Sequence, residues 1–376
     1  MKSKQTIVYI GPYIALTGST MVMMELLNNF DREKYSLYYF ALSLRMNEDI
    51  KKQINPDIQF VTFGHLKNFW SRSFIYKIRL WLSIVKRIKE FKTDFLIIDQ
   101  RIYTYRLLIL KILFGLKCKI VCRFGNVASE AVKRNSMEHI TGKILYPKTD
   151  VVVVPSNLAR DSFISFYNFV PEKVKTVYNT INTERFKEVP FEAGSKDRNV
   201  ILYLASLDSR KDPMCLVKAF HLFLQEETHP DNFELWLVGE GNLKETIRKY
   251  ADENSIGGKV KLIGNVSNPF YHFSNADLFV TCSHFDGFGI AVAEAVYFKR
   301  PVIYSDAPVG VNELLKKHNI GISYKTGDSD DLCKKIRLVF SNEAPKLNLQ
   351  AYDNFIHEIS KETFLRSYNE IIEGLG

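Results

Sequence analysis

Short apolar runs alternate with amphipathic segments along the whole chain. The apolar runs are rich in Val, Ile and Leu and lack a regular polar alternation, which favours strands that are buried on both faces of a sheet. Segments such as 20–30 (TMVMMELLNNF) and 213–227 (PMCLVKAFHLFLQEE) have the apolar spacing of helices. Because strands and helices alternate, the pattern predicts parallel sheets built from βαβ units.

The strand pattern falls into two series. The first series is expected at 6–11, 36–42, 58–63, 95–99, 119–124, 151–155 and 174–179, and the second at 199–205, 233–239, 260–264, 278–282 and 300–305. The intervening segment 183–198 is polar and contains both Pro and Gly. We therefore predict two doubly wound, Rossmann-like α/β domains, 1–185 and 186–355, with a cleft between them and ligands at the carboxyl ends of the strands.

Length and composition are compatible with this division. A chain of 376 residues that is 46% hydrophobic can form two domains, each with its own core. The five cysteines are odd in number and lack the spacing of a disulfide framework or a zinc site, which indicates reduced thiols. The sequence shows neither a secretory signal nor an apolar run of membrane-spanning length, so we expect a cytoplasmic protein.

The charge is distributed unevenly between the two halves. Residues 1–185 contain 29 Lys+Arg and 15 Asp+Glu, a net charge of +14, whereas residues 186–376 contain 22 and 27, a net charge of −5. The sum is the +9 of the whole chain. A basic half can face nucleic acid, an anionic membrane or a phosphorylated substrate.

Segment 66–92 combines an apolar stripe with basic residues at the remaining helical positions. The stripe is Phe74, Ile78, Trp81, Val85 and Ile88, and the basic residues are Lys77, Arg79, Lys86, Arg87, Lys89 and Lys92. A basic amphipathic helix can lie on an anionic membrane, or its stripe can pack on the sheet while its lysines are solvated. We expect the stripe to pack on the sheet and the surplus charge to face a membrane or a diphosphate-linked lipid. No nucleic-acid recognition motif is present, so we expect no nucleic-acid partner.

The segment 284–296 (HFDGFGIAVAEAV) carries the strongest chemical signal. It follows the strand expected at 278–282, and its glycines allow the backbone to approach a ligand closely at a helix start, where free N–H groups favour an anion. Asp286 precedes that helix, and Glu294 lies about two turns along it. Two carboxylates can accept hydrogen bonds from sugar hydroxyls. The alternative is a plain helix start, with Asp286 as the cap and Glu294 as a solvated acid.

Two further loops could hold phosphate. In the segment 203–220 (YLASLDSRKDPMCLVKAF), Arg210 and Lys211 lie at a helix start, where two cations beside free amides suit a phosphate group. An exposed basic turn is the alternative. Gly18, Ser19 and Thr20 lie between the first strand and the first helix, but the glycine-rich phosphate-loop motifs are absent, and either hydroxyl could simply cap the helix.

Taken in order and spacing, these three segments resemble the retaining nucleotide-sugar glycosyltransferases of family 4, also called group 1, which have the GT-B fold. DGFGIAVAE resembles the E-x7-E motif of the family, with Asp286 and Glu294 as its two acids. ASLDSRK resembles its Gly-Arg-Leu stretch, with Lys211 as the lysine that follows, and TGST stands in place of its first glycine-rich loop. Shorter similarities, such as VVVVPSNLARDSF and RPVIYSDAPVGVNELL, extend over the whole chain.

The resemblance implies retaining transfer of a hexosyl or N-acetylhexosaminyl group from a nucleotide-diphosphate sugar, with a UDP-sugar favoured, to a glycan or lipid-linked acceptor in surface polysaccharide biosynthesis. Glu294 would bind the ribose and Asp286 the donor sugar. Lys211 and Arg210 would neutralise the leaving diphosphate, a role that metals play elsewhere, so no metal or cofactor is expected. The other donor-binding residues implied are Gly18, Ser19, Thr20, Ser206, Asn265, Val266, Gly287, Phe288, Gly289, Ile290 and Ala291, and the acceptor-side residues are Arg123 and Asn126.

The sequence departs from the family pattern at three places. Ser206 replaces an arginine, Asp286 is one methylene shorter than glutamate, and the segment CRFGN lacks a histidine that often follows the fifth strand. A non-catalytic partner subunit with this fold, or a relative such as a nucleotide-sugar epimerase, is therefore the alternative. We expect the C-terminal helix, about 355–376, to cross back to the first domain, and Asp328 to cap a helix and not to bind metal.

Overall fold

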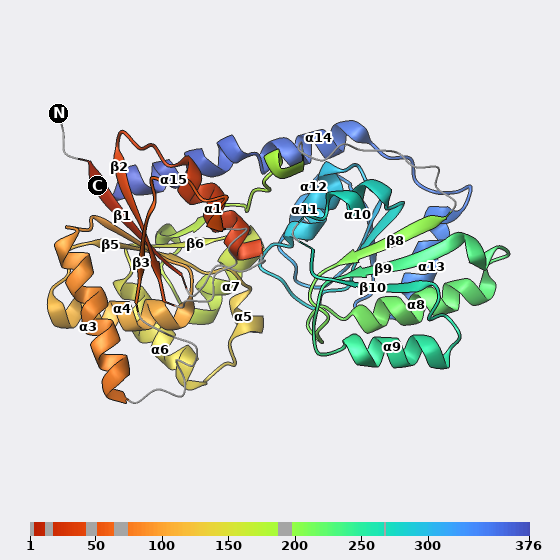
Figure 1. The fold of residues 1–376 in the computed structure, drawn as a ribbon, viewed down its shortest axis with the longest axis horizontal. Helices are drawn as coiled ribbons and strands as arrows, with labels where there is room; N and C mark the ends of the chain where they lie inside the picture. Colours follow the sequence, from red (N-terminus) through yellow and green to blue (C-terminus); the bar gives the residue numbers. More distant parts are fainter. Residues whose placement is uncertain (1–3, 12–17, 43–50, 64–73, 187–197, 267) are drawn as a thin grey trace. The chain divides into compact units, whose positions relative to one another are not determined.

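The computed structural model describes residues 4–11, 18–42, 51–63, 74–186, 198–266 and 268–376 (Figure 1). The chain divides into two compact units. Unit 1 comprises Met1–Thr180 together with Lys361–Gly376, and unit 2 comprises Ile181–Ser360. The sequence had placed the corresponding boundaries at 185 and about 355. The cleft expected between the domains remains a prediction.

Unit 1 is built on a seven-stranded parallel sheet in the order β3-β2-β1-β4-β5-β6-β7. The strands are β1 (Gln5–Gly11), β2 (Tyr35–Ala41), β3 (Gln59–Thr62), β4 (Phe95–Ile98), β5 (Lys119–Arg123), β6 (Val151–Val154) and β7 (Val174–Thr176). All seven expected strands are confirmed. β4 and β6 are buried along their whole length, as their unbroken apolar sequences predict.

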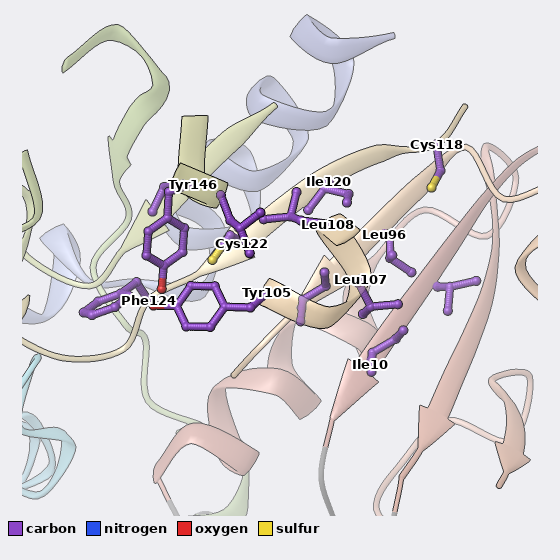
Figure 2. Close-up of a cluster of buried hydrophobic side chains, with 14 of the residues drawn as sticks. Ile10, Leu96, Tyr105, Leu107, Leu108, Cys118, Ile120, Cys122, Phe124 and Tyr146 are labelled. Atoms are coloured by element: carbon purple, nitrogen blue, oxygen red, sulfur yellow. The ribbon is translucent and has the colours of Figure 1, made fainter. Parts of the chain in front are cut away.

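One face of this sheet is covered by helices whose apolar sides form the larger part of the core. The helices of unit 1 are α1 (Gly18–Asn29), α3 (Phe74–Glu90), α4 (Arg101–Phe114), α5 (Ala128–Ala131), α6 (Met137–Leu145), α7 (Asn157–Tyr167) and α15 (Lys361–Leu375). Val8 and Ile10 of β1 point into the same cluster as Leu107 and Leu108 of α4. Figure 2 shows part of this cluster, with Tyr105 and Tyr146 beside Cys122 and Phe124.

The stripe predicted in segment 66–92 packs mainly inward. Trp81, Val85 and Ile88 of α3 are buried in the core, as expected, whereas Ile78 is exposed. The side chain of Phe74 and residues 66–73 lie outside the described residues.

A charged cluster is buried against the opposite face of the sheet. Arg123 donates a hydrogen bond from Nη1 to the Tyr9 hydroxyl at 2.8 Å and lies 3.4 Å from Asp99 Oδ1. Tyr368 of α15 hydrogen-bonds the same guanidinium. Burial raises the pKa of Asp99, and the Arg123 charge opposes that rise. The last helix is therefore held on unit 1 by polar contacts as well as by packing.

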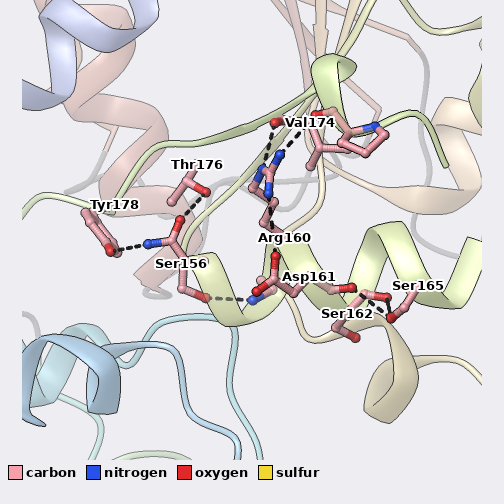
Figure 3. A network of polar contacts seen from close by, with 11 residues as sticks. Ser156, Arg160, Asp161, Ser162, Ser165, Val174, Thr176 and Tyr178 are labelled. Carbon is pink, nitrogen blue, oxygen red and sulfur yellow. Dashed lines mark hydrogen bonds and ion pairs between the residues drawn. The ribbon is translucent and has the colours of Figure 1, made fainter.

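Polar side chains fix the last strand of unit 1 to α7 (Figure 3). Asn157 donates to the Tyr178 hydroxyl at 2.8 Å and accepts from Thr176 Oγ1 at 2.9 Å. Arg160 donates to the carbonyl oxygens of Val174 and Pro171, each at 3.2 Å. These contacts hold an edge strand of only three residues in place.

Unit 2 is a six-stranded parallel sheet in the order β10-β9-β8-β11-β12-β13. The strands are β8 (Asn199–Leu204), β9 (Phe233–Val238), β10 (Val260–Gly264), β11 (Leu278–Thr281), β12 (Val302–Ser305) and β13 (Ile322–Tyr324). The five expected strands are confirmed, and β13 was missed. The helices are α8 (Pro213–Glu226), α9 (Lys244–Glu253), α10 (Phe270–Asn275), α11 (Ile290–Tyr297), α12 (Val311–Lys317), α13 (Ser329–Phe340) and α14 (Leu349–Glu358).

Two further predictions concerned a helix cap and membrane-spanning helices. Asp328 caps α13 by accepting a hydrogen bond from the Asp331 amide at 3.0 Å, as expected. Among the described residues, the helices are too short or too polar to span a bilayer.

The packing of α15 on unit 1 is open to a direct test. We expect Ile372→Ala to lower the free energy of unfolding of unit 1 by about 2–5 kcal/mol, because Ile372 is fully buried and its truncation leaves a cavity. Urea unfolding followed by fluorescence in a Trp236→Phe background measures this, because the other two tryptophans lie in unit 1. Glu370→Ala, on the exposed side of α15, is the control. Equal losses in the two variants would contradict the packing.

Candidate functional site

The candidate site lies where the strand order of unit 2 reverses. β9 and β10 follow β8 in the sequence and lie on one side of it within the sheet. The next strand, β11, lies on the other side of β8. Leu278 and Phe279 of β11 pair with Ile201 and Leu202 of β8, so the loops that follow these strands leave the same edge side by side. Ligands of doubly wound sheets bind at such a switch point.

The two loops are joined by backbone and side-chain contacts. The His284 amide donates to the Arg210 carbonyl at 2.9 Å. The Arg210 guanidinium lies over the Phe285 ring, 5.8 Å from its centroid. His284 Nε2 is 3.3 Å from Asp212 Oδ2, and the Asp212 side chain caps α8 by accepting from the Cys215 amide. The loops therefore form one polar surface at the start of α8.

An ion pair between Lys211 and Asp286 lies at the centre of this surface. Lys211 Nζ donates to Asp286 Oδ2, and the two side chains keep only 13% and 21% of their exposure. Burial would raise the pKa of the Asp286 carboxyl, but the charge and the hydrogen bond of Lys211 outweigh it, and the pKa is lowered. The structure thus brings together two predicted catalytic residues that are 75 positions apart.

Asp208 fixes the backbone that carries Lys211. Its carboxylate accepts from the Ser206 hydroxyl at 2.6 Å and from the Lys211 amide at 3.1 Å. Burial tends to raise the pKa of Asp208, but these hydrogen bonds lower it overall. The single O–H of Tyr203 is shared between the carbonyls of Ser206 and Lys211, at 3.2 and 3.1 Å, and so ties the two ends of the loop together. Ser206 therefore helps to fix the conformation of this loop. It does not supply the positive charge that the arginine provides at this position in the family.

The turn from Asp286 to Gly289 is held by the segment before α12 and by the first residue of that helix. The Gly310 amide donates to the Asp286 carbonyl at 3.1 Å, and the Val311 amide donates to the Phe288 carbonyl at 2.8 Å. Phe288 is buried, and Gly289 has φ of 105°, a conformation that favours glycine.

Helix α11 begins directly after this turn. Its N-cap residue, Gly289, has no side chain that could accept a hydrogen bond. The first-turn N–H groups, which include those of Ile290 and Ala291, are thus left without a capping side chain and favour an anion. Glu294 lies about one turn along α11 and is 5% exposed, so the alternative of a solvated helix acid is wrong.

The neighbouring strands complete the edge. Asn265, which follows β10, is exposed, and Val266 is half-buried. The loop after β9 touches the loop after β8 so closely that a Cβ on Gly241 would lie 2.2 Å from the Leu207 carbonyl oxygen. Glycine at this position permits the close approach of the two backbones.

The remaining predicted residues belong to unit 1. Gly18 and Ser19 are exposed at the start of α1, whereas Thr20 is buried. Arg123 is buried and paired with Asp99, and Asn126 is half-buried. Their roles in binding remain predictions, as do those of the unit 2 residues.

Sequence reasoning missed three residues that organise the site: Asp208, Asp212 and His284. The signal for Asp212 was present, because an Asp immediately before Pro213 is a helix start signature. No local pattern pointed to the other two residues. Among the described residues, no group of three or more His, Cys, Asp or Glu side chains is arranged to hold a metal ion.

Parallel sheets with a polar site at the switch point are typical of doubly wound proteins that bind nucleotides. Comparison with known proteins identifies the family. Residues 185–357 match the family model described as glycosyl transferases group 1, and residues 16–185 match the model described as Glycosyltransferase Family 4. The chain therefore belongs to the group 1 glycosyltransferases, as the sequence resemblance indicated.

Two relatives come from Campylobacter jejuni. One is named "N-acetylgalactosamine-N,N'-diacetylbacillosaminyl-diphospho-undecaprenol 4-alpha-N-acetylgalactosaminyltransferase" and is 23% identical over 254 residues, 64% of this chain and 68% of the relative. The other is an alpha-1,4-N-acetyl-D-galactosaminyltransferase whose named acceptor is also linked to PP-undecaprenol, and it is 24% identical over 71% of this chain and 70% of its own length.

The fold agrees with solved structures. HepE from Anabaena, crystallised in complex with UDP and glucose, superimposes with a TM-score of 0.81 over 98% of this chain and 100% of HepE, at 15% identity. This similarity confirms the GT-B fold.

The Lys211–Asp286 pair predicts a pH-dependent effect on stability. At neutral pH we expect Lys211→Met to lower the free energy of unfolding of unit 2 by about 1–2 kcal/mol, less than the loss for a fully buried pair, because both side chains keep some exposure. The pKa of Asp286 lies below its ordinary 3.8 in the folded protein, so the stabilisation is present above that pH and is lost as the pH falls through the lower value. Urea unfolding with Trp70 and Trp81 replaced by Phe, so that Trp236 reports, measures the difference.

The difference between the two proteins should shrink as the pH is lowered. Lys211→Met removes the two strongest interactions that lower the pKa of Asp286, so this pKa rises relative to the parent and the cost of the unpaired charge disappears on protonation. The double variant Lys211→Met/Asp286→Asn is the control, since it contains neither charge. A difference that is independent of pH would contradict the pairing.

Proposed function

We propose that this chain transfers a hexosyl or N-acetylhexosaminyl group from a UDP-sugar to a lipid-linked glycan, with retention at the anomeric carbon, in surface polysaccharide biosynthesis. The Lys211–Asp286 pair at the switch point of unit 2 is the observation that carries the proposal. The named acceptors of the two Campylobacter relatives support a lipid-linked acceptor, and the HepE complexes support UDP as the nucleotide.

Lys211 changes its partner when the donor binds. The diphosphate takes the ammonium group from Asp286, and the freed carboxylate accepts a hydrogen bond from a hydroxyl of the donor sugar. Charge on the departing UDP grows as the glycosidic bond breaks, so a cation already fixed beside it stabilises the transition state more than the ground state. Arg210, held over Phe285 in the same loop, adds a second positive charge. These two cations supply the charge for which other transferases use a metal.

The other donor-binding roles are proposed from the resemblance to the family, and the positions of these residues in unit 2 are compatible with them. The first-turn amides of α11, at Ile290 and Ala291, bind the diphosphate. The buried carboxylate of Glu294 accepts hydrogen bonds from the ribose hydroxyls. The base lies against the segment after β10, at Asn265 and Val266.

The configuration at the anomeric carbon is retained if the acceptor attacks the same face of the sugar from which the diphosphate departs. The acceptor oxygen bonds to the anomeric carbon as the bond to the diphosphate oxygen breaks, and that oxygen takes the acceptor proton. Unit 2 therefore needs no separate general base, and none is assigned among the residues above.

The non-catalytic alternative is favoured only by the departures at Ser206 and Asp286 and by the absence of a histidine in the segment CRFGN. In the structure, Ser206 helps to hold the loop of Lys211 through Asp208, and Asp286 reaches Lys211 despite its shorter side chain. Both departures are compatible with a functional site, so we favour the enzyme.

Binding of nucleotides tests the proposal. We expect UDP without added metal to bind with an affinity that Lys211→Met lowers at least about tenfold, since a hydrogen bond to a charged group contributes about 1.5–3 kcal/mol and each tenfold equals about 1.4 kcal/mol. Isothermal titration calorimetry measures the affinity, and a panel of UDP-sugars assayed for UDP release then identifies the donor.

Matched variants separate charge from fold. Lys218→Met removes an exposed lysine from α8 and should leave the affinity unchanged. The double variant Lys211→Met/Asp286→Asn leaves no unpaired buried charge and should still bind UDP weakly. The proposal is wrong if Lys211→Met binds UDP as tightly as the parent, or if neither UDP nor another nucleoside diphosphate binds.

A further inference from the structure

The outward sides of α4 and α6 in unit 1 are apolar, although both helices lie on the surface of the unit. Among the described residues, ten of the fifteen exposed large hydrophobic side chains belong to α3, α4 or α6. We use the name α4–α6 face for the eight on α4 and α6: Ile102, Ile109, Ile112, Leu113, Phe114, Met137, Ile140 and Ile144. A cluster of this size on neighbouring surface helices marks an interaction site.

The face is continuous because the two helices lie side by side. Arg101 Nε of α4 is 2.6 Å from Glu138 Oε1 of α6, and the Tyr105 hydroxyl donates to the Glu138 carbonyl at 3.5 Å. Along α4, Ile102, Ile109 and Leu113 recur at helical spacing and form one stripe. Met137, Ile140 and Ile144 do the same on α6.

The exposed residues are not needed for the core. The opposite sides of the two helices supply it, through Leu107 and Leu108 of α4 (Figure 2) and through Leu145 of α6. Leu113 is 70% exposed and Ile144 is 64% exposed, so both side chains make little contact with the rest of the unit. A helix that is apolar on both sides requires a second apolar environment besides its own core.

The part of the chain that carries the face is strongly basic. Residues 74–150, which contain α3, α4 and α6, carry sixteen Lys+Arg and six Asp+Glu, a net charge of +10 and thus most of the excess of the basic half. Lys117 follows α4, and Lys143 and Lys148 lie on and just after α6, all exposed. Aliphatic side chains flanked by lysines match the boundary between anionic headgroups and acyl chains.

We infer that the α4–α6 face docks on an anionic lipid membrane. The aliphatic side chains enter the acyl boundary, and the lysines lie among the headgroups. A protein partner fits less well, because protein interfaces are enriched in aromatic residues and Arg and depleted of Lys, whereas this face holds one aromatic residue among eight. The inference rests on this surface alone and does not require the proposed function to be correct.

The docking surface differs from the one suggested by segment 66–92. The residues Trp81, Val85 and Ile88 of α3 are buried and cannot reach a bilayer. α3 meets the face where Lys89 Nζ lies 5.8 Å from the centroid of the Phe114 ring, and it contributes charge through Lys86 and Arg87, both of which are partly offset by Glu90. The apolar contact with lipid therefore comes from α4 and α6.

Binding to vesicles tests the inference with the full chain. At low ionic strength we expect the protein to sediment with vesicles of phosphatidylcholine and phosphatidylglycerol and not with phosphatidylcholine alone. Leu113→Glu/Ile144→Glu should weaken this binding at least about tenfold, since two aliphatic side chains no longer enter the bilayer. Both positions are exposed, so the variant should fold normally, and circular dichroism checks this.

The matched control changes the charge of unit 2 by the same amount. Leu347→Glu/Leu349→Glu replaces two exposed leucines outside the face and should bind vesicles as the parent does. Equal weakening in the two double variants would mean that net charge alone drives binding, and absence of binding by the parent would also overturn the inference. A parent that elutes as a dimer, together with a monomeric Leu113→Glu/Ile144→Glu variant, would assign the face to self-association instead.

Discussion

A lysine ammonium and an aspartate carboxylate, both withdrawn from most of the solvent, join the loops after β8 and β11. Neither group is stable in this position without the other, because an unpaired charge with little exposure loses much of its hydration. The Lys211–Asp286 pair therefore restrains two loops at the point where a phosphate-bearing ligand of a doubly wound sheet binds. A ligand that carries two or more negative charges is the natural competitor for the lysine.

The rest of unit 2 keeps this pair in place. Asp208 and Tyr203 fix the backbone of Lys211, and the segment before α12 fixes the turn of Asp286. Most of these bonds involve backbone groups, so the site depends on loop geometry more than on side-chain identity. This explains how Ser206 and a shortened acid are accommodated in a group 1 glycosyltransferase: each keeps a hydrogen bond to its neighbouring loop residue.

The sequence predicted the sheets better than it predicted the contacts. Unbroken apolar runs such as VVVV at β6 predicted buried strands, whereas β13, with three residues, was too short to give a pattern. The motif order located Lys211 and Asp286, but their pairing depends on the adjacency of β8 and β11, which periodicity does not define. The α4–α6 face was missed because apolar residues surround α4, and only the fold distinguishes the buried side from the exposed side.

The central claim is that Lys211 exchanges Asp286 for the diphosphate of the donor. A crystal structure of the full chain bound to UDP tests this claim most directly. The account predicts that Lys211 Nζ leaves Asp286 Oδ2 and lies within hydrogen-bonding distance of a phosphate oxygen, with the diphosphate beside the first turn of α11. UDP bound elsewhere, or bound at this edge while the Lys211–Asp286 pair stays intact, would contradict it.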